Sequence, residues 1–116
     1  MYIFPVRCDG AEELKYIFPL KQKAAQKAIE IAKRDKRIKR IIAFGSAVTT
    51  SCGINSDIDI AIDAPNVTDD DFVKLARPFL REVPSEIDII HYNNIHSELL
   101  KHEIKTKGVT IYDAGI

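Results

Sequence analysis

The sequence predicts a single α/β domain with helices packed on a sheet. Amphipathic helical patterns alternate with short β-branched runs, and no linker or low-complexity segment divides the 116 residues. A chain of this length forms one domain around a single core. The predicted order of elements is helix, strand, polar connector, strand, helix, strand, helix and strand.

Residues 1–20 are interpreted as an N-terminal extension, and residues 21–116 as the domain itself. "YIFPV" (2–6) and "YIFPL" (16–20) flank the turn pair Asp9-Gly10. A hairpin at the edge of the sheet and a short helix over residues 11–18 both fit this pattern, and both remain open. Two copies are too few for a repeat protein, so the similarity is attributed to local composition.

The first helix is predicted from Leu20 to about Lys36. Its apolar residues recur at helical spacing, namely Leu20, Ala24, Ala28 and Ile31. The basic run "KRDKRIKR" closes this helix and is interpreted as a solvated end facing the helix dipole. An acidic partner or the phosphates of a ligand are the alternative.

Two strands follow. "RIIAF" (40–44) is β-branched and of strand length, and residues 57–62 alternate without interruption. In the second strand Asp57 and Asp59 share one face, while the isoleucines between them share the other. Asp63 continues the carboxylate face, but it precedes Pro65 and is interpreted as a turn residue.

The second half of the chain predicts two helices and two strands. Thr68 caps a helix with an inward stripe of Phe72, Leu75, Ala76, Phe79 and Leu80, which Pro78 should kink or restart. "EIDIIHY" (86–92) is a strand with Asp88 at its centre. Asn94 is expected to cap a last helix, with Ile95, Leu99, Leu100 and Ile104 facing inward. Gly108 ends that helix, and "VTIY" (109–112) forms the last strand.

Composition excludes several classes of function. Seventeen basic residues balance seventeen acidic ones, which argues against nucleic acid as a partner. No apolar stretch approaches about 18 residues, so no membrane span is predicted, and the N-terminus does not resemble a signal peptide. Cys8 and Cys52 are interpreted as free thiols of a reducing cytoplasm, with a disulfide in an oxidising compartment as the alternative.

The paired aspartates predict a metal site. Residues i and i+2 on a strand point the same way with α-carbons roughly 6–7 Å apart, so Asp57 and Asp59 can share or bracket a cation. Asp88 completes the set if its strand is a neighbour. Three carboxylates around two magnesium ions are typical of in-line phosphoryl or nucleotidyl transfer. The alternative is a solvent-facing edge of a half-exposed strand.

Gly45 and Ser46 predict a phosphate-binding turn directly after the first strand. Glycine lets the backbone approach a phosphate closely, and the Ser46 hydroxyl adds a hydrogen-bond donor. Ser51, Gly53, Asn55 and Ser56 make the rest of the connector polar. His91, His96 and His102 are spaced unlike zinc ligands and are interpreted as surface or capping residues, with a contact from His91 and Tyr92 to a base or acceptor as the alternative.

"GSAVTTSCGINSDID" resembles the G-S, ten residues, D-x-D motif of the DNA polymerase β-like nucleotidyltransferase superfamily. The resemblance extends from about Ile38 to Tyr112, with Asp88 in "EIDII" matching the third family carboxylate. The short length is similar to the minimal nucleotidyltransferases (MNT). Many of these are antitoxins encoded beside a HEPN-type toxin, and some adenylylate that toxin. The implied fold is a mixed sheet of four to five strands with helices packed against it.

The resemblance also implies a chemistry. It makes the chain an adenylyltransferase that moves AMP from ATP to a hydroxyl acceptor, with a HEPN-like protein as partner or with self-association completing the acceptor site. Gly45, Ser46 and Ser56 would bind the nucleotide. Asp57 and Asp59 would bind two Mg²⁺ ions, and Asp88 would bind the catalytic ion and help deprotonate the acceptor.

One departure from the family keeps other functions open. Many minimal members carry arginines shortly after the Gly-Ser pair, whereas Ala47, Val48, Thr49 and Thr50 follow here, and this removes a phosphate clamp. The alternatives are a degenerate module that neutralises its partner by contact, an adenylyltransferase for small molecules such as antibiotics, and a metal-dependent phosphohydrolase.

Overall fold

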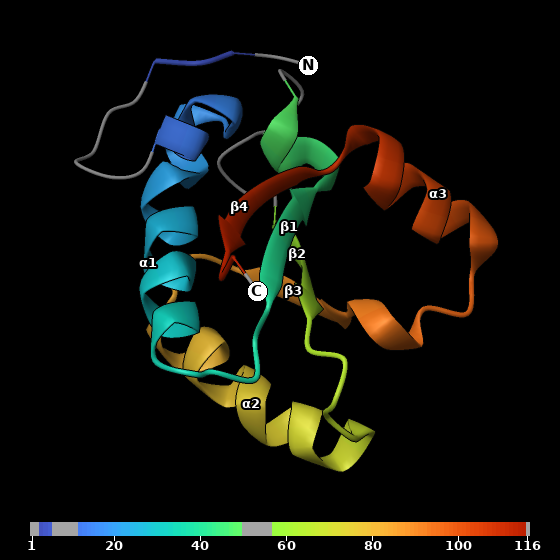
Figure 1. Ribbon diagram of the computed structural model, residues 1–116. Coiled ribbons are helices and arrows are strands. Elements are labelled where there is room, and N and C mark those ends of the chain that lie inside the picture. The colour runs from blue at the N-terminus through green and yellow to red at the C-terminus, as the bar shows by residue number, and fades with distance from the viewer. Residues whose placement is uncertain (1–2, 6–11, 50–56, 116) are drawn as a thin grey trace.

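The computed structural model describes residues 3–5, 12–49 and 57–115 and contains a four-stranded mixed sheet in the order β3-β2-β1-β4 (Figure 1). The strands are β1 (Arg40–Phe44), β2 (Ile58–Asp63), β3 (Ile87–His91) and β4 (Val109–Asp113). β1 is antiparallel to β2 and β4, and β2 is parallel to β3. The predicted α/β class and mixed sheet are therefore confirmed.

Helices cover both faces of this sheet. α1 (Gln22–Lys33) and α2 (Asp69–Glu82) pack on one face, and α3 (Glu98–Lys107) lies on the other (Figure 1). The described part of the chain also contains four short 3₁₀ helices: η1 (Glu12–Tyr16), η2 (Pro19–Lys21), η3 (Gly45–Val48) and η4 (Tyr92–Asn94). Among the described residues, no helix is long and apolar enough to cross a membrane.

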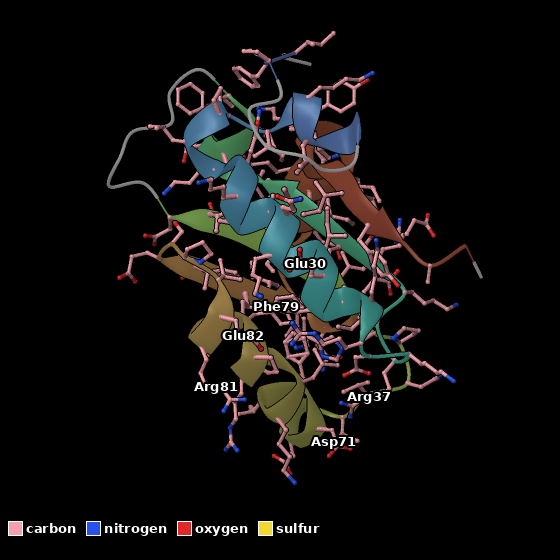
Figure 2. All side chains as sticks on the ribbon, turned by 90° about the vertical axis from the view of Figure 1, so that its left-hand side faces the viewer. Glu30, Arg37, Asp71, Phe79, Arg81 and Glu82 are labelled. Carbon is pink, nitrogen blue, oxygen red and sulfur yellow. The ribbon has the colours of Figure 1, made fainter. Side chains whose placement is uncertain are left out.

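The core lies mainly between the sheet and the α1–α2 layer. Ile58, Ile60 and Ile62 of β2 are fully buried there, as the alternation of this strand predicts. Phe79 of α2 is also fully buried and lies between the two helices and the sheet (Figure 2). The opposite face has a smaller apolar cluster, in which Ile104 of α3 is the central helical residue.

Three leucines predicted to face inward are instead exposed: Leu20 by 56%, Leu80 by 60% and Leu99 by 80%. Leu20 lies in η2, because α1 begins only at Gln22. For α3 the cap was assigned wrongly: the Ser97 hydroxyl accepts the Leu100 N–H at 3.2 Å, and Asn94 lies in η4. Leu100 and Ile104, four residues apart, share the inward face of α3, whereas Leu99 lies five residues before Ile104 and points away from it.

α2 begins as predicted, with the Thr68 hydroxyl accepting the Asp71 N–H at 3.2 Å. The predicted restart at Pro78 is wrong, since α2 continues through it to Glu82. Proline removes one backbone hydrogen bond of a helix, but the burial of the next residue, Phe79, offsets part of this cost.

The N-terminal extension is part of the packed molecule. η1 confirms helical structure over Glu12–Tyr16, while the Asp9-Gly10 turn lies outside the described residues. Leu14 and Ile17 are fully buried in the main core. The domain boundary at residue 20 remains a prediction, but these two side chains contribute to the same core as the sheet.

Candidate active site

The topology of the sheet brings the predicted site residues to one end. β1 leads directly into Gly45, and because β2 is antiparallel to β1, Phe44 at the end of β1 pairs with Asp59 near the start of β2. β3 is parallel to β2, and Asp88 pairs directly with Asp59. Gly45, Asp59 and Asp88 therefore meet although they come from three different strands or strand ends.

Gly45 packs against the Asp59 carboxylate. Its φ of +73° is in the left-handed region that favours glycine. A Cβ atom at this position would collide with Oδ2 of Asp59 and lie 3.3 Å from its Cγ. The glycine is thus required both by the backbone conformation and by the close approach to the carboxylate.

The electrostatics of this end of the sheet are strongly acidic. The pKa of Asp59 is raised from 3.8 to about 6, first by burial and then by the charge and the side-chain hydrogen bond of Asp88. The charges of Asp57 and Glu103 raise it further. The ionised form of Asp59 is therefore disfavoured in the folded chain, and a bound cation would offset this cost.

The turn after Gly45 is the short helix η3. Ala47 is fully buried and Val48 is 6% exposed, so both side chains point into the protein. Ser46 is only half-buried, and its carbonyl accepts both the N–H and the hydroxyl of Thr49 at 3.0 Å. Ser46 thus offers the polar side chain of this turn, while Ser56, the third predicted nucleotide-binding residue, lies outside the described residues.

Magnesium fits the Asp59–Asp88 pair. Mg²⁺ typically binds one or two protein carboxylates and completes its shell with substrate phosphates and water. Within residues 3–5, 12–49 and 57–115, no three His, Cys, Asp or Glu side chains come close enough together to form a metal site. Asp57 precedes β2, is exposed, and acts on Asp59 through its charge.

Glu103 was missed by the sequence analysis. It lies on α3 beside Ile104, which packs against Ile42, Phe44 and Ala61 on the same face of the sheet. The helical pattern indicated that Ile104 faces the sheet, but not which strands lie beneath it. Without the strand order, nothing in the sequence placed Glu103 near Asp59.

Asp63, predicted to be a turn residue, is the last residue of β2 and is 8% exposed. Its Oδ2 accepts the Nε–H of Arg40 at 2.8 Å, and its Oδ1 accepts the Nδ2–H of Asn93 at 2.9 Å. The carboxylate is therefore paired and structural, at the opposite end of β2 from Asp59.

His91 is also part of the packing at this far end. Its side chain is 8% exposed, stacks on Phe72 with centroids 4.3 Å apart, and has Nε2 3.0 Å from the Ala64 carbonyl. Arg40 lies over the Tyr92 ring at 5.3 Å. Neither His91 nor Tyr92 lies at the Asp59 end of the strands.

The chain belongs to the family described as "Polymerase beta, Nucleotidyltransferase", which matches residues 26–115. No curated protein matches the chain significantly. Solved structures share its fold at low sequence identity. One is a chain of a toxin–antitoxin complex with AMP-PNP, 24% identical with a TM-score of 0.65, covering 78% of this chain and 74% of that chain.

Two further structures show the same fold. A chain of the MntA–HepT toxin–antitoxin complex is 24% identical with a TM-score of 0.59, covering 79% of this chain and 72% of that chain. A chain from the complex of a tri-AMPylated Shewanella oneidensis HEPN toxin with its MNT antitoxin is 23% identical, also with a TM-score of 0.59. It covers 80% of this chain and 72% of that chain.

Proposed function

We propose that this chain is a magnesium-dependent nucleotidyltransferase that transfers AMP from ATP to a hydroxyl group of a partner protein. Family membership supports the class of reaction. The observation that carries the proposal is the Asp59–Asp88 pair against Gly45, with the pKa of Asp59 raised to about 6. Asp59 is half-buried and Asp88 is exposed, and a like-charge pair with a perturbed pKa is more typical of a functional site than of a folding contact.

Asp59 and Asp88 are the residues proposed to hold magnesium, and Asp57 adds its negative charge beside them. When bound, the metal neutralises charge on the phosphates and makes the acceptor hydroxyl more acidic. Gly45 allows the backbone to approach the phosphates, and Ser46 donates its hydroxyl to them. Asp88 accepts the proton of the acceptor hydroxyl.

The reaction exchanges one phosphorus–oxygen bond for another. The acceptor oxygen forms a bond to the α-phosphorus of ATP, and the bond between that phosphorus and the bridging oxygen to the β-phosphate breaks. Pyrophosphate leaves with the bonding electrons, and the acceptor is left carrying AMP. The chain's own contribution is to position the phosphates and to take up one proton.

The partner proposed is a HEPN-type toxin. Each of the solved structures above is a toxin–antitoxin complex, and one holds a toxin that is AMPylated. AMP-PNP, an ATP analogue, is present in one of them, which supports ATP as donor.

Incubation with labelled ATP, Mg²⁺ and a HEPN-type toxin tests the proposal. We expect label on the partner with the wild type, and a loss of about 100-fold or more with Asp57→Ala plus Asp59→Ala. Asp70→Asn, at an exposed position of α2 far from the pair in sequence, is the matched control and should label normally. Unchanged labelling by the double variant would refute the enzyme assignment.

A second function, neutralisation of the partner by contact alone, is favoured by one observation. Gly45–Thr49 contains no cationic residue for a triphosphate, and Ala47 and Val48 are buried in the core. This function predicts that the double aspartate variant still binds and silences the partner. Retained silencing without any labelling would establish it in place of the enzyme.

A further inference from the structure

The turn Phe18–Lys21, which precedes the family match at residue 26, contacts both halves of the candidate site. Lys21 N–H donates to the Phe18 carbonyl at 2.8 Å and closes this turn. Figure 1 shows η1 and η2 at the same end of the sheet as η3. The two outward bonds of the turn are made by the backbone of Phe18 and the side chain of Lys21.

The first bond holds the nucleotide side of the site. Phe18 N–H donates to the Ala47 carbonyl at 2.7 Å. Ala47 is the third residue of η3, directly after Gly45 and Ser46. Because the Ser46 carbonyl is also bonded, to Thr49, the two bonds fix the orientation of this turn.

The second bond holds the strand that carries Asp88. Lys21 is 6% exposed, and its Nζ donates to the Ser85 hydroxyl at 2.9 Å. The Ser85 hydroxyl in turn donates to the Glu86 carbonyl at 3.2 Å. That carbonyl also accepts the N–H of Ile58 at 2.9 Å. Ile58 lies between Asp57 and Asp59, so the chain of bonds ends at the site's carboxylates.

A buried ammonium group is costly to place in a protein unless it is well paired. No salt bridge to Lys21 is present among the described residues, and its one described side-chain partner is a neutral hydroxyl. A methionine or leucine would fill this position at lower cost. The lysine is therefore better explained by its role in positioning Ser85 than by a contribution to the stability of the fold.

We propose that Lys21 is a positioning residue for nucleotide binding: with the Phe18 N–H, it sets the Gly45–Ser46 turn at a fixed place relative to the strands of Asp59 and Asp88. This inference rests on the proposed function, because it assumes that nucleotide binds between these groups. It adds a role for a segment outside the family match. Lys21 itself does not touch the nucleotide.

Lys21→Met is the main test, since methionine keeps the apolar stem and removes the donor. We expect the affinity for AMP-PNP with Mg²⁺ to fall about tenfold. A tenfold change in affinity is comparable to the net contribution of about one hydrogen bond. Ser85→Ala should give the same loss, and the double variant should be no worse than either single one. Lys23→Met, at an exposed lysine of α1, is the matched control and should bind as the wild type does.

A merely structural role predicts a different result. In that case Lys21→Met would change the melting temperature and leave nucleotide affinity equal to that of Lys23→Met, and the proposal would be overturned. Additive losses in the double variant would overturn it as well. If the wild type binds no AMP-PNP, the proposed function fails first and the positioning role fails with it, so the two failures are distinguished by the wild-type measurement.

A second pair of variants covers the case that Lys21→Met does not fold. Phe18 has φ −54° and ψ 136°, which a proline before Pro19 can adopt. Phe18→Pro removes the N–H to Ala47, while Phe18→Ala removes the same ring and keeps the N–H. We expect about fivefold weaker binding of AMP-PNP by the proline variant than by the alanine variant. Equal binding by the two would contradict the proposal.

Discussion

The raised pKa of Asp59 links the charge of this carboxylate to the stability of the fold. Its pKa of about 6 in the folded chain lies above the ordinary value of 3.8, so the folded state binds the proton more tightly than the unfolded state does. The stabilisation is complete below pH 3.8 and is lost as the pH rises through 6. Its size is on the order of 1 kcal/mol, since the side chain is partly exposed and solvent screens it.

Asp59→Asn should therefore stabilise the protein at pH 7 in the absence of divalent cations. We expect a gain of about 1 kcal/mol over the wild type at pH 7 and no gain at pH 4, where the wild-type carboxyl is already protonated. Thermal melts at both pH values measure this. Asp70→Asn, which removes an exposed carboxylate, should show no comparable gain at pH 7, and a pH-independent effect of Asp59→Asn would contradict the linkage.

Gly45 and Gly115 provide a matched pair at positive φ. Gly45 (φ +73°) faces Asp59, whereas a Cβ at Gly115 (φ +76°) would meet no atom within 4 Å. Both alanine variants should incur a backbone cost of on the order of 1 kcal/mol. Only Gly45→Ala should also displace the Asp59 carboxylate and abolish Mg²⁺-dependent binding of AMP-PNP, measured by calorimetry. Equal binding by the two variants would show that contact with Asp59 does not matter.

Elements at the far end of the sheet are joined through Asp63. It connects β2 to Arg40 of β1 and to Asn93 of η4. Asp63→Ala removes the acceptor of the Asn93 amide and the counter-ion of Arg40, and we expect a loss of about 2 kcal/mol. Chemical denaturation measures this loss, and unchanged labelling at a temperature where the variant is folded would separate stability from activity.

Arg37→Ala provides the comparison for that experiment. It removes an ion pair with Asp35 in which the Arg37 side chain is 50% exposed. Exposed pairs contribute little, so we expect a loss below about 0.5 kcal/mol. A similar loss in the two variants would mean that the burial of Asp63 adds nothing.

The strands were predicted more reliably than the helix faces, and the reason is physical. β1 follows from its apolar run and β2 from its strict alternation of side chains. Leu80 and Leu99 fit helical stripes equally well, but whether a stripe is covered depends on where the helix begins and on what lies beside it. Leucines at such positions are exposed at little cost.

At the scale of the whole molecule, ligand binding should raise the melting temperature. ATP and Mg²⁺ together at about 100 times the dissociation constant should add about 2.7 kcal/mol to the free energy of unfolding. Either ligand alone should add far less, because Mg²⁺ must bridge the aspartates and the phosphates for either to bind tightly. Calcium in place of magnesium gives a control that carries the charge without the same geometry. A shift with ATP alone would contradict a metal-bridged site.

The site residues proposed from the sequence remain a prediction, and their arrangement in space could not be read from the sequence. The spacing of Gly45, Asp57 and Asp59 is visible in the sequence, because they lie at the end of β1 and the start of β2, which follow one another along the chain. The pairing of Asp59 with Asp88 depends on strand order, which periodicity does not give. The contact of Lys21 with Ser85 spans 64 residues, and a lysine before a helix has no pattern that distinguishes it from a solvated one.

Two cross-strand pairs between β1 and β2 show what this arrangement requires of its surroundings. Arg40 stands opposite Asp63, and Phe44 stands opposite Asp59. Asp63 thus has Arg40 as a counter-ion on the neighbouring strand, whereas Asp59 stands opposite the uncharged side chain of Phe44. Among the described residues, every ionic influence on Asp59 comes from another acid. The negative charge at that end of the strand must therefore be balanced by a proton or a cation from solution.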